Sequence, residues 1–250
     1  MDHAGIVFDH VRKEYPDGTV AVGDLSLAVT PGEVLCLVGP SGCGKSTTLR
    51  MVNRLVEPTG GTITVDGADV LSQDPVRLRR SIGYVIQHVG LFPHRTVAQN
   101  VATVPGLLKW DKARTRERVE QLLDLVGLPH ATYGKRYPHE LSGGERQRVG
   151  VARALAVEPP VMLMDEPFGA VDPQGRRRLQ QEFLELQRSL GLTVMMVTHD
   201  MREAVILADR IAVLSKGGVL EQLGTPDEVT DAPANAFVAD FLADFGTVAG

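Results

Sequence analysis

The stretch that decides the fold runs from Glu33 to Val52 and reads EVLCLVGPSGCGKSTTLRMV. Its first part, EVLCLV, is an apolar run with PG before it and GPSG after it, which is typical of a short buried strand. STTLRMV and the following NRL show helical periodicity until EPTGG ends the helix. The turn between them matches the pattern G-x-x-x-x-G-K-[ST]. A strand, a glycine-rich loop and a helix in this order predict a phosphate-binding loop.

The loop GPSGCGKS contains the groups that bind a nucleotide. Its glycines allow backbone N–H groups to curl around phosphate oxygens, and the helix N-terminus adds a favourable dipole. We expect Lys45 to reach the β- and γ-phosphates and the Ser46 hydroxyl to ligate Mg²⁺. A chance glycine-rich turn is the alternative, and the flanking strand and helix argue against it. The predicted ATP-binding residues of the loop are Gly39, Pro40, Ser41, Gly42, Cys43, Gly44, Lys45, Ser46 and Thr47.

Two further apolar runs end in chemically active side chains. VMLMDE places Asp165 at a strand end, where its carboxylate is predicted to hold the Mg²⁺ shell. Glu166 follows it and is placed to orient and activate the attacking water. VMMVTHD ends another run with His199, which we expect to contact the γ-phosphate. An acidic turn after a buried strand, and a structural histidine, are the alternative interpretations.

The rest of the chain predicts an α/β fold with two additions. Buried strands alternate with helices around VMLMD, GRRRLQQEFLELQRSL and LTVMMVTHD, which favours a core with a parallel sheet. IVFDHVRKEY and TVAVGDLSLAVT, joined by the turn PDG, predict an antiparallel portion, and TITVDGADV alternates like a strand. Residues 89–157 are mostly helical in pattern and are interpreted as an insertion. The predicted nucleotide-binding domain covers residues 1–230, and residues 231–250 form a short helical tail.

Local patterns give finer expectations for three helices. TRERVEQLLDLVGL is expected to turn one apolar face inward and to end at Gly127. The residues of that face are Val119, Leu122, Leu123, Leu125 and Val126. GTPDEV carries the signature of a helix start. In the tail, Phe237, Phe241 and Phe245 lie at i, i+4 and i+8 and are expected to dock on the core.

Composition and charge restrict the class of protein. Apolar residues make up 43% of the 250 residues and charged residues 23%, as is ordinary for a globular protein. The net charge of −5 and the pI near 5.8 argue against a nucleic-acid binder, and the basic clusters at 77–80 and 176–178 are interpreted as solvated faces. No apolar run approaches the roughly 18 residues that span a bilayer, and the N-terminus lacks a signal-peptide pattern. We therefore expect a cytoplasmic protein whose connection to a membrane comes through a partner.

The segment LSGGERQR, residues 141–148, looks like a second phosphate loop that lacks the lysine. Ser142 and Glu145 fit a capping box, in which each side chain binds the backbone N–H of the other residue. The box does not explain Gly143 and Gly144, because glycine in a helix costs stability. Two glycines make sense where a phosphate approaches the backbone closely. We predict that this segment contacts a nucleotide, which need not be the one bound by the loop of the same chain.

Together these motifs resemble the ATP-binding-cassette ATPases over nearly the whole chain. The loop with Lys45, then Gln87, LSGGE, VMLMDE, the aspartate of FGAVD and His199 occur in the order of that family. The resemblance implies a P-loop NTPase fold with a RecA-like core, an antiparallel β subdomain and an inserted helical subdomain, with ATP and Mg²⁺ as ligands. It also implies a head-to-tail homodimer. Each ATP would lie between the lysine loop of one subunit and the LSGG segment of the other.

The resemblance assigns roles to further residues. The segment from Ser142 to Glu145 would face the γ-phosphate held by the partner. Gln87 would sense Mg²⁺ and the attacking water while it touches the transport subunit. Asp172 would link the two sites of the dimer, and Tyr15 would stack on adenine. For Tyr15, an aromatic residue that merely flanks a turn is the alternative interpretation.

Two positions in these motifs raise separate questions. The family usually has glutamine where this chain has Glu145. Either residue satisfies the capping box, but a carboxylate near a γ-phosphate would repel it unless it turned away, which affects hydrolysis rather than the fold.

The cysteines, Cys36 and Cys43, fit a reducing compartment without a disulfide, and Cys36 is interpreted as core. Cys43 lies near a helix N-terminus, where a thiolate is favoured, so we expect alkylation to block hydrolysis and ATP to protect.

A closer resemblance concerns the transported solute. VIQHVGLFPHRTVAQNVATVPGLLKW and KRYPHELSGGERQRVGVARAL look like the ATPase subunit of uptake systems for glycine betaine, choline, carnitine and related quaternary amines. This resemblance implies two transmembrane permease subunits, an extracytoplasmic solute-binding protein and no nucleic-acid partner. It also implies a peripheral position on the cytoplasmic face of the cell membrane.

Several alternatives stay open at the level of sequence. Among importers, polar amino acids, methionine and phosphate are competing cargoes. A cassette ATPase of DNA repair, chromosome structure or translation belongs to another class, and such proteins usually show coiled coils, zinc insertions, basic surfaces or two cassettes. A P-loop kinase leaves LSGGE unexplained. Glu166 directly after Asp165 also favours water activation over transfer to a bound acceptor.

Overall fold

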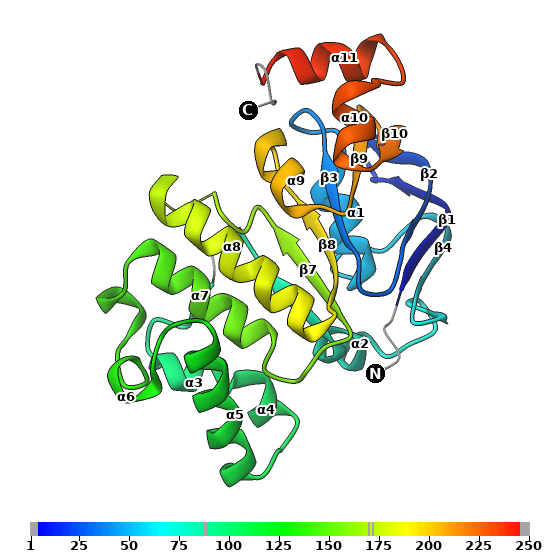
Figure 1. The fold of residues 1–250 in the computed structure, drawn as a ribbon. Coiled ribbons are helices and arrows are strands. Elements are labelled where there is room, and N and C mark those ends of the chain that lie inside the picture. Colours follow the sequence, from blue (N-terminus) through cyan, green and yellow to red (C-terminus); the bar gives the residue numbers. More distant parts are fainter. Residues whose placement is uncertain (1–4, 88–89, 170, 172, 246–250) are drawn as a thin grey trace.

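Two β-sheets and the helices around them form the part of the chain that the computed structural model describes, residues 5–87, 90–169, 171 and 173–245 (Figure 1). The N-terminal sheet is antiparallel and has the order β2-β1-β4-β5. Its strands are β1 (Ile6–Glu14), β2 (Val20–Val29), β4 (Gly60–Val65) and β5 (Ala68–Asp69). Buried and exposed residues alternate in β2, so one face packs on the core and the other meets solvent. The predicted antiparallel portion is confirmed.

The second sheet has the order β10-β9-β3-β8-β7-β6 and is parallel from β9 to β6. Its strands are β3 (Val34–Val38), β6 (Ile82–Val85), β7 (Val161–Asp165), β8 (Thr193–Val197), β9 (Arg210–Ser215) and β10 (Val219–Gly224). The register pairs Val197 with Leu37 on one side and with Asp165 on the other. The carboxyl ends of three central strands therefore meet at one edge, which is where open α/β sheets bind ligands.

Helices surround the parallel sheet, and one group of them lies between β6 and β7 in the sequence. Those are α3 (Val97–Val101), α4 (Thr103–Leu107), α5 (Lys112–Leu125), α6 (His130–Tyr133), the 3-10 turn Pro138–Glu140 and α7 (Gly143–Ala154). The others are α1 (Lys45–Val52), α2 (Pro75–Ser81), α8 (Pro173–Leu190), α9 (Met201–Leu207), α10 (Pro226–Asp231) and α11 (Ala236–Ala243). Figure 1 shows α3 to α6 gathered at the end of the molecule opposite α11. Among the described residues, no helix has the length and apolar character needed to cross a membrane.

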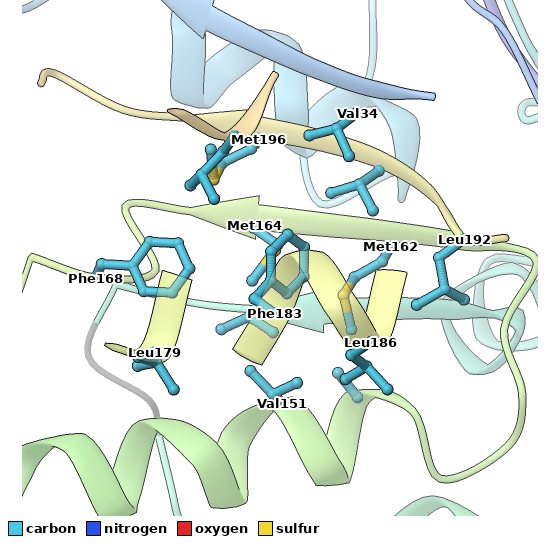
Figure 2. Packing of buried hydrophobic residues seen from close by; sticks show 14 of the residues in the cluster. Val34, Val151, Met162, Met164, Phe168, Leu179, Phe183, Leu186, Leu192 and Met196 are labelled. Atoms are coloured by element: carbon cyan, nitrogen blue, oxygen red, sulfur yellow. The ribbon is translucent and has the colours of Figure 1, made fainter. Parts of the chain in front are cut away.

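The central strands are buried on both faces, which explains their continuous apolar sequences. In β7, Met162 and Met164 belong to one cluster of buried side chains, and Val161 and Leu163 belong to the other. Figure 2 shows Met162, Met164, Phe183 and Leu186 in the first cluster, where side chains of the sheet meet those of α8. The α/β fold with a parallel core sheet, predicted from the alternation of strands and helices, is confirmed.

The finer expectations for the helices are confirmed with one exception. Val119, Leu122 and Leu123 of α5 are buried, but Leu125 is 49% exposed, so its assignment to the apolar face is wrong. Leu125 is the last residue of the helix and lies two positions after Leu123, about 200° around the helix axis, so it falls outside the narrow stripe of buried residues. GTPDEV forms a capping box at the start of α10. The three phenylalanines of the tail pack, half-buried, against the larger core cluster.

Candidate functional site

A pocket of about 670 Å³ lies at the carboxyl edge of the parallel sheet. Its size is within the range of small-molecule sites. The described residues that line it come from the N-terminal sheet, the phosphate loop, the ends of β7 and β8 and the turn between β9 and β10: Tyr15, Thr19, Val20, Ala21, Ser41, Gly42, Gly44, Lys45, Ser46, Thr47, Glu166, His199, Lys216 and Gly217. Segments more than 150 residues apart in sequence therefore meet at one site.

Two glycines of the phosphate loop occupy positions that no other residue fits. Gly39 has φ +146 and Gly44 has φ +110. A Cβ atom on Gly39 would collide with the carbonyl oxygen of Leu214, and one on Gly44 with that of Ala21. The tight path of the loop against both sheets requires these glycines. Gly44 caps α1, so the N–H groups of the first turn of that helix open toward the pocket.

The amine of Lys45 is held by the loop itself. Its Nζ donates hydrogen bonds to the carbonyl oxygens of Gly39 at 2.7 Å and Pro40 at 2.9 Å. The side chain lines the pocket although the residue is only 7% exposed. A buried cation at a helix N-terminus suits a ligand with several negative charges.

Ser46 and Asp165 bring two side-chain oxygen atoms together. The Ser46 hydroxyl donates to Oδ1 of Asp165 at 3.0 Å, and Nη2 of Arg50 donates to Oδ2 at 3.1 Å. Asp165 is 3% exposed, and the contact with Arg50 pairs this buried carboxylate with a positive charge. A hydrogen bond that Arg50 donates to Tyr84 is the main cause that raises the pKa of Arg50, with a further contribution from Asp165, and burial raises the pKa of the Tyr84 phenol. Two of the three side chains predicted to lie near a metal, Ser46 and Asp165, are thus adjacent.

Glu166 lines the pocket directly after β7, together with His199. Its Oε2 accepts a hydrogen bond from Nε2 of Gln87 at 2.6 Å and lies 3.2 Å from Nδ1 of His199. Its backbone is in the left-handed region, with φ +47, and its N–H donates to the carbonyl of Val197 at 2.9 Å. Strained backbone of this kind is frequent at functional sites. All three residues predicted for catalysis therefore meet at one carboxylate oxygen.

Tyr15 also lines the pocket. Its hydroxyl is 3.5 Å from the Thr47 hydroxyl, and the Lys13 amine lies 5.0 Å from the centre of the ring. The ring is part of the pocket lining together with Thr19, Val20 and Ala21 of the preceding turn and β2. An aromatic side chain beside short apolar residues is suited to a planar base.

The LSGGE segment forms the N-terminus of α7 and does not contribute to the pocket among the described lining residues. The capping box is present: the N–H of Glu145 donates to Ser142 Oγ at 3.3 Å, and the N–H of Ser142 donates to Glu145 Oε2 at 2.7 Å. A Cβ atom on Gly144 would meet only a Val171 methyl group at 3.6 Å, so packing within the chain does not demand that glycine.

The carboxylate of Glu145 is turned back onto its own helix end. The backbone hydrogen bond from Ser142 is the main cause that lowers the pKa of Glu145, and Tyr133 and Arg148 lower it further. The same interaction with Glu145 raises the pKa of the Tyr133 phenol. The negative charge is therefore engaged by local donors rather than directed outward from the helix.

Three predicted loop residues are not among those that line the pocket. Gly39 and Pro40 contribute the carbonyl groups that hold Lys45. Cys43 is 1% exposed and belongs to the core cluster under the loop, so the expectation that its thiol is open to alkylation is wrong. The loop wraps around this side chain because glycines on both sides take up the bend. Cys36 is core, as predicted, and burial raises the pKa of its thiol. Asp172 lies outside the described residues.

Comparison with known proteins places this architecture in a family. The family model described as "ABC transporter" matches residues 22–169. The chain belongs to the ABC transporter family. Its phosphate loop, LSGGE segment and VMLMDE strand all lie within the matched region.

Relatives within the ABC transporter family are similar over nearly the whole chain. The glycine betaine/carnitine/choline transport ATP-binding protein OpuCA of Bacillus subtilis is 56% identical over 234 residues, 94% of this chain and 61% of that protein. The glycine betaine uptake system ATP-binding protein YehX of Escherichia coli is 50% identical over 95% of this chain and 76% of its own length. The chain spans about three fifths of the length of the first curated relatives that it matches.

A solved structure of the same ABC architecture supports the fold. The ATP-binding cassette MJ0796, in a dimeric post-hydrolysis state with ADP and Pi, superposes with a TM-score of 0.78 at 33% identity. The alignment covers 88% of this chain and 98% of that chain.

Some residues in or beside the pocket of this ABC-family chain are not predicted from its sequence. Arg50 lies four residues after Ser46 and so on the same face of α1, which is a signal that could have identified it. Lys216 and Gly217 reach the pocket from the turn between β9 and β10, and no local pattern connects that turn with the phosphate loop.

Proposed function

We propose that the chain binds ATP in this pocket and hydrolyses it. The observation that carries the proposal is the convergence on one pocket of Lys45 at the N-terminus of α1 with Glu166 and His199 at the ends of β7 and β8. The loop supplies N–H groups and a cation for phosphates, and Tyr15 supplies a stacking surface for the base. The dimeric ADP-bound relative supports the same assignment.

The residues that would hold Mg²⁺ fit that ion. Ser46 Oγ and Asp165 Oδ1 are 3.0 Å apart. Two neighbouring ligands of an octahedral Mg²⁺, each about 2.1 Å from the ion, lie about 3 Å apart. Gln87 would approach the same region through its amide oxygen, because its amide nitrogen already binds Glu166. When bound, the ion neutralises charge on the phosphates.

Glu166 would act as the general base. Its Oε2 would accept the proton of the attacking water, and the amide of Gln87 orients that oxygen. His199, 3.2 Å away, can donate a hydrogen bond to the γ-phosphate or to the carboxylate. Lys45 would remain beside the transferred phosphate and stabilise the charge there.

The second phosphate-binding segment would complete the site of a partner subunit. Ser142, Gly143 and Gly144 stand at the N-terminus of a 12-residue helix, apart from the pocket of their own chain. A head-to-tail dimer would bring that helix N-terminus to the phosphates of the other subunit. Because Glu145 is engaged by the Ser142 N–H, its carboxylate would not oppose the phosphate directly. Asp172 would contact the partner in this dimer.

The biological role would be to energise an importer of quaternary amines. The relatives named for glycine betaine, choline and carnitine transport, at 50–56% identity, support this cargo class. ATP-driven closure of the dimer would move two transmembrane permease subunits that receive the solute from an extracytoplasmic binding protein. The chain would lie peripherally on the cytoplasmic face of the membrane.

The dimer is tested by light scattering after size-exclusion chromatography, with the Glu166→Gln variant, with and without ATP. We expect a monomer that becomes a dimer with ATP. Adding Gly144→Asp should abolish the shift, because its carboxylate would face the partner's phosphate, while an acidic residue in the first turn is tolerated by the helix itself. Gly106→Asp, at a helical glycine with open space around it, is the matched control and should leave the shift intact. Dimerisation that survives Gly144→Asp contradicts the composite site.

The cargo is tested by uptake into membrane vesicles that contain the chain with its permease and binding protein. Labelled glycine betaine should accumulate with ATP, and labelled polar amino acids should not. Accumulation of amino acids alone would overturn the assignment of cargo. ATP hydrolysis with no solute uptake would favour a cassette ATPase outside transport.

A further inference from the structure

A buried carboxylate next to the pocket takes no part in the chemistry proposed above. Glu203, in the first turn of α9, is 5% exposed. Its Oε2 accepts a short hydrogen bond from the Thr198 hydroxyl, and its Oε1 accepts one from Nε2 of Gln180 at 3.0 Å. Both donors are also buried, at 1% and 4% exposure. A buried charged group is costly unless it is paired. The contacts of Glu203 therefore hold three elements together: the loop after β8 that contains Thr198, helix α8 with Gln180, and α9 itself.

The first of these elements carries His199. Thr198 directly precedes it, and the Thr198 hydroxyl also accepts a hydrogen bond from the N–H of Asp200 at 3.1 Å. The Thr198 hydroxyl thus links the residue before His199 to the residue after it, and both to Glu203. The His199 side chain itself is 67% exposed and touches Glu166 at 3.2 Å. Its position depends mainly on the backbone that Thr198 holds in place.

The second element is α8, which begins shortly after Glu166 in the sequence. Gln180 lies in this helix, one face of which also carries Arg176. Arg176 donates to the carbonyl oxygen of Val171 at 3.3 Å and lies 3.7 Å from the carboxylate of Asp200. One helix therefore contacts both the segment that follows Glu166 and the loop that contains His199.

We propose that Glu203 is a positioning residue, which ties the His199 loop to α8 so that His199 stays against Glu166. The inference rests on the proposed hydrolysis of ATP at this pocket. Displacement of α8 would be transmitted through Gln180 and Glu203 to Thr198, and from there to His199. Since α8 continues from the segment expected to face the second subunit, the tie couples dimer closure to the position of His199.

The first test compares Thr198→Val with Thr198→Ser in the full chain. Valine has the shape of threonine without the hydroxyl, whereas serine keeps the donor. We expect Thr198→Val to lower kcat for ATP hydrolysis by about tenfold or more with KM changed less than about threefold, because His199 is misplaced while the nucleotide contacts remain. Thr198→Ser should stay within about threefold of the wild type. Wild-type kcat in Thr198→Val overturns the proposal, as does an equal loss in both variants.

The second test exchanges the polar groups of Gln180 and Glu203, which are hydrogen-bonded to each other. Gln180→Glu alone places two carboxylates against each other in a buried site and should lower kcat by about tenfold or more. The double variant Gln180→Glu with Glu203→Gln restores one amide and one carboxylate and should recover kcat to within about threefold. A double variant as impaired as the single one, although folded by thermal melting, overturns the proposal.

These outcomes are distinguishable from a failure of the proposed function. If the wild type bound ATP without hydrolysing it, or if Glu166→Gln hydrolysed ATP at the normal rate, the site assignment would fail whatever the Thr198 variants did. Normal catalysis in the wild type with unaffected Thr198 and Gln180 variants refutes only the positioning role.

Discussion

Replacing Glu166 with glutamine removes the proposed general base and leaves almost everything else in place. Removing a positioned base costs about 10²–10⁴-fold in rate. At about 1.36 kcal/mol per tenfold, this corresponds to about 2.7–5.4 kcal/mol in the activation free energy. The variant retains an oxygen at the end of the side chain, so the contact with Gln87 can persist. We therefore expect kcat to fall at least a hundredfold while ATP still binds.

The effect of the same change on stability is small. The Glu166 carboxylate contacts an exposed glutamine and a histidine that is 67% exposed, and exposed polar contacts contribute about 0–1 kcal/mol. For a chain of 250 residues, that range shifts the melting temperature by at most about 4 °C. The loss of rate thus exceeds anything that partial unfolding at the assay temperature would cause.

Glu158→Gln is the matched control. Glu158 is also a glutamate in the left-handed region, with φ +54, and it also pairs with a basic side chain, Arg118, at 3.4 Å. It is not among the described residues that line the pocket. Phosphate release, nucleotide binding and thermal melting are measured for both variants. Hydrolysis by Glu166→Gln within tenfold of the wild type, with normal ATP binding, would refute the role of the carboxylate.

Four other predictions concern the phosphate loop at the start of α1 and the LSGGE segment at the start of α7. Gly44→Ala should abolish ATP binding in a nucleotide titration and lower stability by about 1–3 kcal/mol, because its Cβ collides with the Ala21 carbonyl. Gly42 is also in the left-handed region but has open space around it, so Gly42→Ala should lower stability and ATP binding less. Glu145→Ala should lower stability by about 1 kcal/mol through loss of the capping contact, and Glu145→Gln by less, as thermal melting can check. The pKa of Glu145 is lower in the folded protein, so the charged carboxylate stabilises the fold at pH values above its unfolded pKa. This stabilisation is lost as the pH falls through the folded pKa. The melting temperatures of the wild type and of Glu145→Gln should therefore converge in acid. Finally, Cys43 should resist alkylation in the folded protein even without ATP, and rapid labelling of the native state would contradict its burial.

Much of the site could be predicted because its parts are local in sequence. The phosphate loop needs particular glycines, a lysine and a helix start within a few residues, and the capping box needs two side chains three positions apart. The central strands were recognisable because burial on both faces requires unbroken apolar sequence. These patterns can be recognised in the sequence without knowing which residues lie beside them in the folded protein.

Other expectations failed because burial depends on what lies across from a residue. Leu125 fits an apolar helical pattern, yet nothing in the pattern shows where the covering surface ends. Cys43 lies in a glycine-rich loop, where exposure is the usual assumption, but the loop closes over it above the core. The periodicity of a sequence shows which residues share a face of a helix or strand, but not the shape of the surface that packs against that face.

The sequence by itself determined the phosphate loop, the apolar strands that carry Asp165 and His199, and the resemblance to cassette ATPases, because each depends on residue types at fixed short spacings. Only the tertiary structure decided that Gln87 and His199 share one oxygen of Glu166, that Arg50 compensates Asp165 and that Glu203 ties α8 to the His199 loop. These contacts join segments from different strands and helices. Their distances follow from strand register and helix packing, which no local stretch of sequence specifies.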